Sequence, residues 1–482
     1  MGLSAASFRD PSGSCLVVGQ RVLRVLDDDS ARELEAFLRT TPARDFEERR
    51  QLVSTRRVAA SELGELRSEA SWAPFLNERG SVQVFEHERV PFRSYPYEWP
   101  PEMLWEAARL TLEMAESALD AGYGLKDATP YNLLFRGCEP IFIDVPSFER
   151  RQAGDPVWRA YAQFVRTFVL PLFVNKRWGL PIADVLRTRR DGLEPSEVYR
   201  LCGPLERLKP PILSLISLPT WLGAKARARG AELYEPRLLA NTEKAQFILR
   251  SLLKRLRRTV DFLQPSTRRS SAWSAYMENH SYRESAFAAK ERFVTELLGQ
   301  FKPKAVLDLG TNTGHFSVAA AKTGAEVIAI DLDPACIGAL FLRAQKEKLN
   351  LLPLVVDLSR PTPALGWRNR ECPSFLSRAC GRCDAVLMLA LLHHLLVTER
   401  IPLPEILSLV AELTSSLAII EYVGPKDEMF IELTRGREQL HASLSREAFE
   451  KACATHFEII SSLHLEGTHR WLYGLKRKGP PQ

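Results

Sequence analysis

Apolar runs of five to seven residues alternate with segments of helical spacing from about Trp273 to the end of the chain. The runs predict strands at 304–309, 326–331, 352–356, 384–389 and 416–422. The segments between them predict helices at 313–323, 334–347 and 403–414. Strands that are apolar on both sides are typical of parallel sheets covered by helices on both faces. The pattern therefore predicts an α/β fold with a doubly wound sheet for residues 273–482.

The pattern changes near the end of the chain. A helix at about 445–455 is followed by two predicted strands at 457–465 and 469–476, which only "EGT" separates. So short a connection joins antiparallel strands, and we expect the last strand to oppose the rest of the sheet. A seven-stranded sheet that ends in such a hairpin is not the arrangement of a nicotinamide dehydrogenase.

The residues before Trp273 have a different character. Residues 1–150 mix strand and helix patterns and are rich in aromatic side chains at 92–105, whereas 151–270 have mainly helical spacing. Prolines and serines at 265–271 predict a linker. Because 482 residues exceed one ordinary core, we predict three parts. They are an α+β domain at 1–150, a helical and basic continuation with a linker at 151–270, and the α/β domain at 273–482.

Positive charge is concentrated in the middle of the chain. The net charge is +6, yet the stretch from Pro181 to Ser270 holds 18 Lys or Arg against 9 Asp or Glu, which is +9. The simpler interpretation is a solvated helical face. The alternative is an electrostatic surface for nucleic acid, anionic lipid or an acidic partner. Few aromatic residues accompany the charge, so a platform for stacked bases is missing and nucleic acid is not the favoured partner.

Cysteine usage and hydropathy indicate the cellular setting. Most of the eight cysteines are scattered, as in proteins of a reducing compartment. Cys380 and Cys383 form a C-x-x-C pair, with Cys372 and His393 as remote further candidates for a zinc site. An ordinary loop is the favoured interpretation, so no metal is predicted. We expect a cytoplasmic protein, because no apolar run reaches the roughly 20 residues of a membrane span and the N-terminus lacks a secretory pattern.

The turn after the first strand of the α/β domain is the most informative short segment. In "VLDLGTNTGHF" (306–316) a buried strand leads into a turn and a helix, with Gly310 and Gly314 placed to let the backbone approach a ligand closely. Asn312 stands where such turns usually carry a middle glycine. Asn tolerates a positive φ better than other side chains, so we expect the turn to form.

Four motifs in order carry a family resemblance. "VLDLGTNTG" (306–314), "VIAIDLDP" (327–334), "VVDLS" (355–359) and "DAVLMLALLHHL" (384–395) resemble the first to fourth motifs of class I S-adenosylmethionine-dependent methyltransferases. The resemblance implies a Rossmann-like sheet, S-adenosylmethionine as the cofactor, and transfer of its methyl group to an acceptor.

The resemblance also implies cofactor-binding residues. The glycine turn would lie beside the methionine moiety, and Asp308 would orient the turn or the cofactor's amino group through water. Asp331 ends the second strand, where a carboxylate can accept hydrogen bonds from both ribose hydroxyls. Its alternative role, as a helix N-cap, suits Asp333 better. Asp357 would meet the adenine amino group, and Leu389 would line the cofactor site.

Two histidines follow the fourth strand, where the acceptor enters in this family. A neutral imidazole of His393 or His394 could take the acceptor's proton as the methyl group moves. The alternative is that one of them packs or caps a helix. Glu421 and Tyr422, at the end of the fifth strand, are candidates for the lining of the acceptor pocket. Methyl transfer depends mainly on alignment of the nucleophile, so no single base is required.

A second resemblance lies in the N-terminal part. "GLKDATPYNLLFRGCEPIFIDVPSFE" (124–149) resembles the catalytic and metal-binding loops of kinase-like phosphotransferases, especially bacterial aminoglycoside and lipopolysaccharide sugar kinases. The resemblance implies that Asp127 faces an acceptor hydroxyl and that Asn132 and Asp144 hold magnesium.

The phosphate-holding residues of that family are missing, however. Lys126 is the first lysine of the chain, and no G-x-G-x-x-G precedes it. A phosphate clamp would have to come from arginines, such as Arg21, Arg24, Arg56 or Arg57. We therefore expect a degenerate kinase-like domain that binds the acceptor or acts as a scaffold.

The order of these parts is similar to that of a group of bacterial nodulation methyltransferases. The leading hypothesis is a methyltransferase with an N-terminal accessory domain, acting on an unidentified acceptor for which a small molecule or glycan is favoured. One alternative is a bifunctional kinase and methyltransferase, and another is an inactive adaptor. The intact set of Gly310, Gly314 and Asp331 argues against the adaptor, because a protein without catalysis has no need of it.

Overall fold

The computed structural model describes residues 13–68, 82–228, 238–266, 284–441 and 444–479. They fall into two compact units. The first comprises Met1–Phe135, Glu139–Pro265 and Gly366–Cys372, and the second comprises Arg136–Cys138, Ser266–Leu365 and Pro373–Gln482. Most of the predicted linker, from 267 on, and the N-terminal segment 1–12 lie outside the described residues. The predicted boundary at residue 150 falls inside the first unit and stays a prediction.

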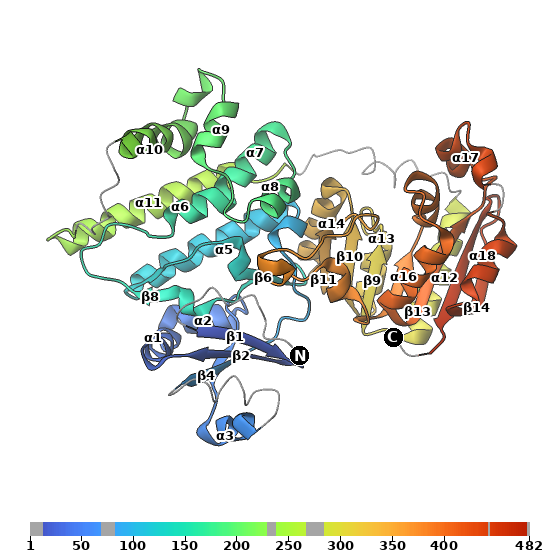
Figure 1. Ribbon diagram of the computed structural model, residues 1–482, viewed down its shortest axis with the longest axis horizontal. Helices are drawn as coiled ribbons and strands as arrows, with labels where there is room; N and C mark the ends of the chain where they lie inside the picture. Colours follow the sequence, from blue (N-terminus) through green and yellow to red (C-terminus); the bar gives the residue numbers. More distant parts are fainter. Residues whose placement is uncertain (1–12, 69–81, 229–237, 267–283, 442–443, 480–482) are drawn as a thin grey trace. The chain divides into compact units, whose positions relative to one another are not determined.

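The second unit is built on a seven-stranded sheet (Figure 1). Its strands are β9 (Ala305–Leu309), β10 (Glu326–Asp331), β11 (Leu351–Val355), β12 (Cys383–Met388), β13 (Thr414–Val423), β14 (Phe457–His464) and β15 (Arg470–Arg477). The order is β11-β10-β9-β12-β13-β15-β14. The first five strands pair in parallel, and β15 is antiparallel to both β13 and β14. The predicted doubly wound sheet and its reversed last strand are confirmed.

Helices alternate with these strands. They are α12 (Glu284–Phe301), α13 (His315–Lys322), α14 (Pro334–Glu347), α15 (Phe375–Ala379), α16 (Leu403–Leu413), α17 (Glu428–Thr434) and α18 (Arg446–Cys453). The predicted helix at 313–323 begins two residues later than expected, because its N-cap Gly314 has a φ of 80° and is left-handed. The chain winds outward from β9 to β11 and then returns to β12 on the other side of β9. Such a reversal leaves a crevice at the carboxyl ends of β9 and β12, where ligands bind in α/β folds.

The first unit begins with a four-stranded antiparallel sheet. Its strands are β1 (Gly13–Val18), β2 (Arg21–Leu26), β3 (Thr55–Arg57) and β4 (Gln83–His87), in the order β1-β2-β4-β3. Helices α1 (Asp28–Leu38), α2 (Thr41–Glu48) and α3 (Ala60–Ser68) accompany them. One core cluster of this sheet joins Leu16, Leu23, Val25 and Val84 to Leu66 of α3.

A long helix, α5 (Pro101–Asp120), forms the centre of the first unit. Thirteen of its 20 residues are buried. Two short ribbons follow it: β5 (Tyr123–Leu125) pairs with β8 (Phe148–Arg150), and β6 (Leu133–Arg136) pairs with β7 (Glu139–Phe142). The loops of these ribbons carry the residues of the kinase-like segment.

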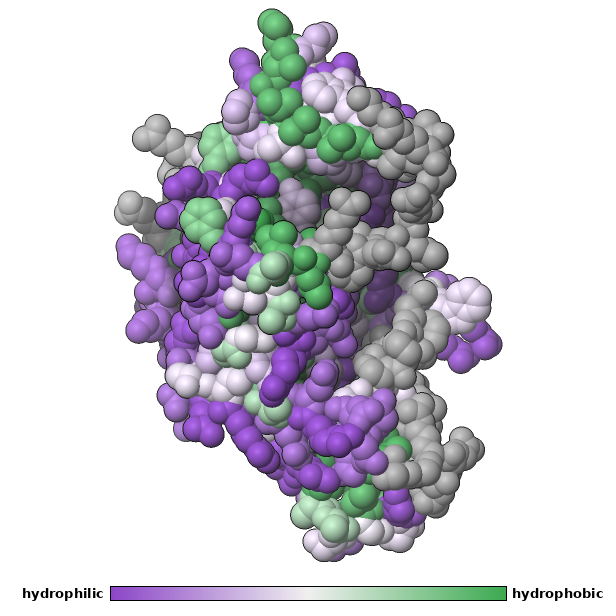
Figure 2. All heavy atoms as spheres, turned by 90° about the vertical axis from the view of Figure 1, so that its left-hand side faces the viewer, coloured by the Kyte–Doolittle hydropathy of each residue, from purple (hydrophilic) through white to green (hydrophobic). Residues whose placement is uncertain are grey.

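The rest of the first unit is helical, as the spacing predicts. Its elements are α6 (Tyr161–Phe164), η5 (Val165–Val169), α7 (Leu170–Trp178), α8 (Ile182–Thr188), α9 (Pro195–Leu201), η6 (Glu206–Leu208), η7 (Leu213–Ser217), α10 (Leu218–Ala228) and α11 (Thr242–Phe262). Helix α11 contacts α5 and buries Leu249, Leu253 and Leu256. Hydrophilic side chains cover much of the face in Figure 2, and hydrophobic ones gather near its top. In the described part of the chain, no helix combines the length and apolar character that a bilayer crossing requires.

Candidate active site

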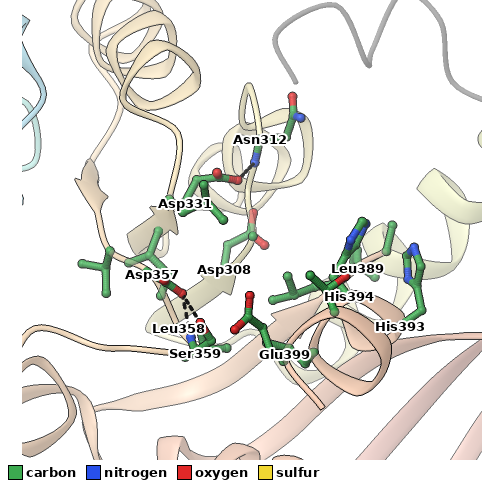
Figure 3. Close-up of a pocket in the computed structure, with 18 of the residues that line it drawn as sticks. Asp308, Asn312, Asp331, Asp357, Leu358, Ser359, Leu389, His393, His394 and Glu399 are labelled. Atoms are coloured by element: carbon green, nitrogen blue, oxygen red, sulfur yellow. Dashed lines mark hydrogen bonds between the residues drawn. The ribbon is translucent and has the colours of Figure 1, made fainter. Parts of the chain in front are cut away.

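A cavity of about 240 Å³ lies at the carboxyl ends of β9 and β12, where the winding of the sheet reverses (Figure 3). Loops after β9, β10, β11 and β12 all contribute to its wall. The lining includes eight residues that the sequence predicted for the site: Asp308, Gly310, Asn312, Asp331, Asp357, Leu389, His393 and His394. The ninth, Gly314, ends the same turn but is not part of the wall.

The glycine turn after β9 is tightly packed. Gly310, Asn312 and Gly314 have φ angles of 69°, 51° and 80°, so Asn312 adopts the left-handed conformation expected of it. A Cβ atom on Gly314 would lie 2.2 Å from Cδ1 of Leu340, and one on Gly310 would lie 3.1 Å from Cδ1 of Leu391. The two glycines are therefore needed both for conformation and for space.

Asp308 connects the end of β9 to the first turn of α13. The Ser317 hydroxyl donates a hydrogen bond of 2.5 Å to its Oδ2, and the hydroxyls of Thr311 and Ser317 are themselves 2.5 Å apart. Asp308 is only 3% exposed, and this burial raises the pKa of its carboxyl group to about 6. These hydrogen bonds connect Asp308 to Ser317 of α13 and, through Ser317, to Thr311 of the glycine turn.

Asp331 lies across the turn at the end of β10. Its Oδ2 accepts a hydrogen bond of 2.8 Å from the Asn312 backbone N–H, and its Oδ1 accepts one of 3.0 Å from the Asp333 N–H. Burial raises the pKa of Asp331. Asp333, and not Asp331, caps α14, because its side chain accepts from the Ala335 N–H at 2.8 Å. Each oxygen of Asp331 can accept further hydrogen bonds from a ligand in the cavity.

Asp357 follows β11 on the same wall. Its Oδ1 accepts hydrogen bonds from the Ser359 N–H at 2.9 Å and the Ser359 hydroxyl at 2.6 Å, and Nε of Arg360 lies 3.1 Å from its Oδ2. Burial acts to raise the pKa of Asp357, but the hydrogen bonds from Ser359 and Arg360 outweigh it and lower the pKa. Asp357 is consequently an ionised acceptor at neutral pH.

The two histidines stand opposite these carboxylates in Figure 3. His393 precedes η9 (His394–Thr398), and the two imidazole rings are 4.2 Å apart. Burial, followed by the nearby His394, Arg470 and Lys290, lowers the pKa of His393 well below its usual value. Its Nδ1 is buried and has no hydrogen-bond partner among the described residues. His393 is thus neutral at physiological pH and belongs to the wall of the cavity.

Sequence reasoning missed a buried group of charges beside the histidines. Lys290 of α12 lines the cavity, and its Nζ lies 2.6 Å from Oε2 of Glu421. Arg470 of β15 lies 3.6 Å from Glu421 and donates hydrogen bonds of 2.8 and 3.0 Å to Asp427. All four side chains are at most 6% exposed. The sequence does contain one sign of this group, which is Glu421 within an apolar strand. A fully buried carboxylate requires a partner.

Glu421 and Tyr422 were predicted as candidates for the acceptor-pocket lining, and neither belongs to the wall of this cavity. Glu421 is occupied by Lys290 at the base of the site. The Tyr422 hydroxyl donates to the Leu444 carbonyl at 2.7 Å. The cavity wall at this end comes instead from α12, η9 and α17, through Phe287, Leu395 and Met429.

The chemistry of the wall suits S-adenosylmethionine. Two carboxylates at strand ends can accept from ribose hydroxyls and from an adenine amino group. Leu332, Leu358 and Leu389 supply apolar surface for the faces of a base. Gly310 and Asn312 bring the backbone of the glycine turn to the wall of the cavity.

Comparisons with known proteins identify the family. A family model described as a methyltransferase domain matches residues 281–472. The nodulation protein NoeA of Rhizobium meliloti strain 1021 is 31% identical over 481 residues, which cover 99% of this chain and 96% of NoeA. The chain belongs to the NoeA family. Its second unit is an S-adenosylmethionine-dependent methyltransferase.

Solved structures of methyltransferases also match this NoeA-family chain over the length of one domain. The N-methyltransferase NodS of Bradyrhizobium japonicum WM9 is 11% identical, with 41% of this chain and 98% of NodS covered and a TM-score of 0.31. The magnesium protoporphyrin IX methyltransferase of Synechocystis PCC 6803, solved with bound S-adenosylmethionine, is 18% identical, with 40% and 83% covered and a TM-score of 0.28.

The kinase-like segment of this NoeA-family chain lines a second cavity, of about 830 Å³, inside the first unit. Asp127, Asn132 and Asp144 all lie on its wall. Nη2 of Arg24 lies 2.8 Å from Oδ1 of Asp144, and the Ser147 hydroxyl donates to Oδ2 of Asp144. Asn132 donates long hydrogen bonds, both of 3.4 Å, to the Asp127 carbonyl and the Ser147 hydroxyl.

Of the four arginines named for a phosphate clamp, Arg24 alone lines this cavity. Arg21 and Arg56 both pair with Glu62 and Glu86, and Arg57 lies 3.0 Å from Glu35. Two further cations of the wall are paired as well: Arg190 with Glu371, and Arg166 with Glu194 at 2.6 Å.

The turn between β1 and β2 is not part of the wall of this cavity. Its two residues, Gly19 and Gln20, are absent from the lining.

The C-x-x-C pair is divided between two elements. Cys380 is exposed at the end of α15, and Cys383 is buried at the start of β12. Within the described ranges, no group of three or more His, Cys, Asp or Glu side chains is placed to hold a metal ion.

Proposed function

We propose that the second unit transfers a methyl group from S-adenosylmethionine to a small-molecule or glycan acceptor that enters beside His393 and His394. One observation carries the proposal. The glycine turn, Asp331 and Asp357 converge on one side of a cavity whose other side holds a buried, neutral histidine.

Each residue of the wall has a distinct task in this proposal. Asp331 accepts from the ribose hydroxyls, Asp357 accepts from the adenine amino group, and Leu389 packs against the cofactor. The turn from Gly310 to Gly314 holds the methionine moiety, with Asp308 fixing the turn through Ser317. The bound cofactor supplies an electrophilic methyl group on a sulfonium. The protein's contribution is alignment of the acceptor atom with that carbon.

His393 is proposed to remove the acceptor's proton. Its Nδ1 is buried at the cavity and lacks a partner among the described residues, so the acceptor's hydroxyl or amine proton can be received there. A depressed pKa keeps the imidazole in the neutral form that a base requires. His394, whose pKa burial also lowers, lies beside it with the two rings tilted by 44° and limits its orientation.

Ligand binding and turnover by the full chain test this proposal. We expect S-adenosylhomocysteine to raise the melting temperature and to bind in titration calorimetry. Tritiated S-adenosylmethionine with a panel of amino- and hydroxyl-bearing sugars should give labelled product that His393→Gln reduces by about 10²–10⁴-fold. Unchanged melting at millimolar S-adenosylhomocysteine contradicts the whole proposal. Full activity in His393→Gln contradicts only the role of the histidine.

For the first unit we propose an accessory role in acceptor binding or scaffolding. The gathering of Asp127, Asn132 and Asp144 on one wall favours a second candidate, a kinase acting on the same glycan or small molecule. The pairing of Asp144 with Arg24 favours the accessory role, because the carboxylate already has a cation within 2.8 Å.

A further inference from the structure

Four neighbouring elements of the first unit expose large apolar side chains. Element η7 contacts α9, α10 and η6, and α9 contacts α10. The exposed group on them, here called the leucine patch, consists of Leu201, Leu205, Leu208, Leu218, Trp221 and Leu222. Leu205 is 78% exposed and Leu222 is 63% exposed. Figure 2 shows hydrophobic side chains near the top of the face, at the height where Figure 1 draws α9 and α10. A contiguous group of this kind marks a contact surface more often than isolated apolar residues do.

The leucine patch rests on a well-packed support. Val198, Leu215 and Ile216 are buried beneath it. Nε1 of Trp221 donates a hydrogen bond of 3.1 Å to the Tyr199 hydroxyl, and the Arg207 guanidinium lies 4.1 Å from the centre of the Tyr199 ring. Because α9 and α10 are joined in this way, the exposed leucines are displayed by ordered helices and do not reflect a loosely packed core.

Two exposed cations belong to the segment that carries the leucine patch. They are Arg200 and Lys209. The neighbouring acidic residues are already neutralised, since Glu197 pairs with Arg189 and Glu206 pairs with Arg177. The stretch from 181 to 270 carries +9, which leaves −3 for the rest of a chain of net charge +6. The apolar side chains therefore lie in the most basic part of the protein.

We propose that the leucine patch docks on the surface of a membrane that contains anionic lipids. Leucine and tryptophan side chains gain free energy at the boundary between headgroups and acyl chains, and adjacent arginines and lysines are attracted to anionic headgroups. A second copy of this chain fits less well, because a symmetric interface would place the same cations opposite each other. Nucleic acid would satisfy the cations but would offer no apolar environment to six exposed hydrophobic side chains.

Vesicle sedimentation with the full chain tests the docking. We expect binding to vesicles of phosphatidylcholine with about one third phosphatidylglycerol, little binding to phosphatidylcholine alone, and weaker binding as salt rises. The double variant Leu205→Asp/Leu222→Asp should lower the partition coefficient at least tenfold. A matched control, Ile431→Asp/Leu440→Asp, changes two exposed apolar residues of the second unit and should bind as the wild type does. Far-ultraviolet circular dichroism and thermal melting of the full chain, compared with the wild type, report that both units of each variant are folded.

Three outcomes would overturn the docking proposal. The first is equal binding of the patch variant and the wild type to anionic vesicles. The second is equal loss of binding in the control variant. The third is a wild-type dimer that the patch variant dissociates, together with no vesicle binding, which would assign the patch to a second copy. None of these outcomes bears on the methyltransferase assignment, because the cofactor cavity contains no residue of the patch.

Discussion

The two cavities of this protein use carboxylates in opposite ways. Asp331 in the second unit accepts hydrogen bonds from two backbone N–H groups, and Asp144 in the first unit faces the guanidinium of Arg24. The backbone bonds leave Asp331 with a net negative charge and further capacity to accept. The charge of Asp144 is largely offset by an arginine that is only 7% exposed.

This difference explains why similar residue types favour different functions. A ligand can add hydroxyl donors to Asp331 without breaking any existing contact. A magnesium ion at Asp144 would have to displace Arg24 or share the carboxylate with it, and two cations so close repel each other. The glycine turn of the second unit lines its cavity through Gly310 and Asn312, whereas the turn between β1 and β2 is not part of the wall of the other cavity. Ligand capacity therefore depends on the neighbours of a carboxylate more than on its presence.

The largest expected effect comes from filling the space at the glycine turn. Gly314→Ala places a Cβ atom 2.2 Å from Leu340 at a φ of 80°. Strain and overpacking together should lower the free energy of unfolding by about 2–5 kcal/mol and weaken S-adenosylhomocysteine binding about 100-fold. Gly324→Ala is a matched control, since its φ is 93° and no atom lies within 4 Å of the new Cβ. Backbone strain in Gly324→Ala should lower the free energy of unfolding by about 1–2 kcal/mol. The affinity for S-adenosylhomocysteine should not change. Equal affinities for the two variants would remove the turn from the site.

The carboxyl group of Asp308 is expected to make the free energy of unfolding depend on pH, by about 3 kcal/mol in total. Its pKa of about 6 lies above the ordinary value of about 3.9, so the folded state keeps its proton to a higher pH than the unfolded state does. The free energy of unfolding should therefore fall as pH rises from about 4 to about 6. In denaturant titrations, Asp308→Asn should remove this fall and gain stability relative to the wild type across that window.

The control for this pH effect is Asp357→Asn, for which the sign reverses. The pKa of Asp357 is lowered in the folded state, so its contribution is present at neutral pH and is lost as pH falls through acid values. Asp357→Asn should consequently lose stability relative to the wild type as pH rises. If the free energy of unfolding of the two variants, relative to the wild type, changed with pH in the same direction, neither carboxylate would have the environment described above.

A smaller effect is expected when the ribose acceptor is removed. Asp331→Ala should weaken S-adenosylhomocysteine binding by about 1–3 kcal/mol, because the ligand's hydroxyls lose their acceptor. Titration calorimetry of the full chain measures this change directly. Asp144→Ala removes a carboxylate from the other unit and should leave the affinity as it is. If Asp331→Ala also has no effect, ribose recognition lies elsewhere.

The secondary structure of the second unit and the residues of its cavity wall could be predicted from the sequence. The charged contacts behind that wall could not. Strands β9 to β15 lie within two residues of their predicted limits, because runs that are apolar on both faces have few other structures available. Residues at strand ends could be placed together because parallel strands end at one edge of the sheet. Lys290 was missed because its helix precedes every motif, and its partner Glu421 is 131 positions away. Pairing across such a distance depends on the packed sheet, which periodicity does not encode.

The smallest change is predicted for the binding and turnover of ATP, which concern the first unit alone. We predict no phosphoryl transfer, and weak ATP binding, because Arg24 offsets the charge of Asp144 and no lysine before Lys126 holds the phosphates. Radiolabelled ATP with magnesium should give no labelled product in the wild type or in Asp144→Ala. Arg24→Gln is a further test, since it removes the cation beside Asp144 and should raise magnesium-dependent ATP binding above that of the wild type. Label transfer by the wild type that disappears in Asp144→Ala would instead establish a working kinase, with Arg24 as a cation that serves the phosphates.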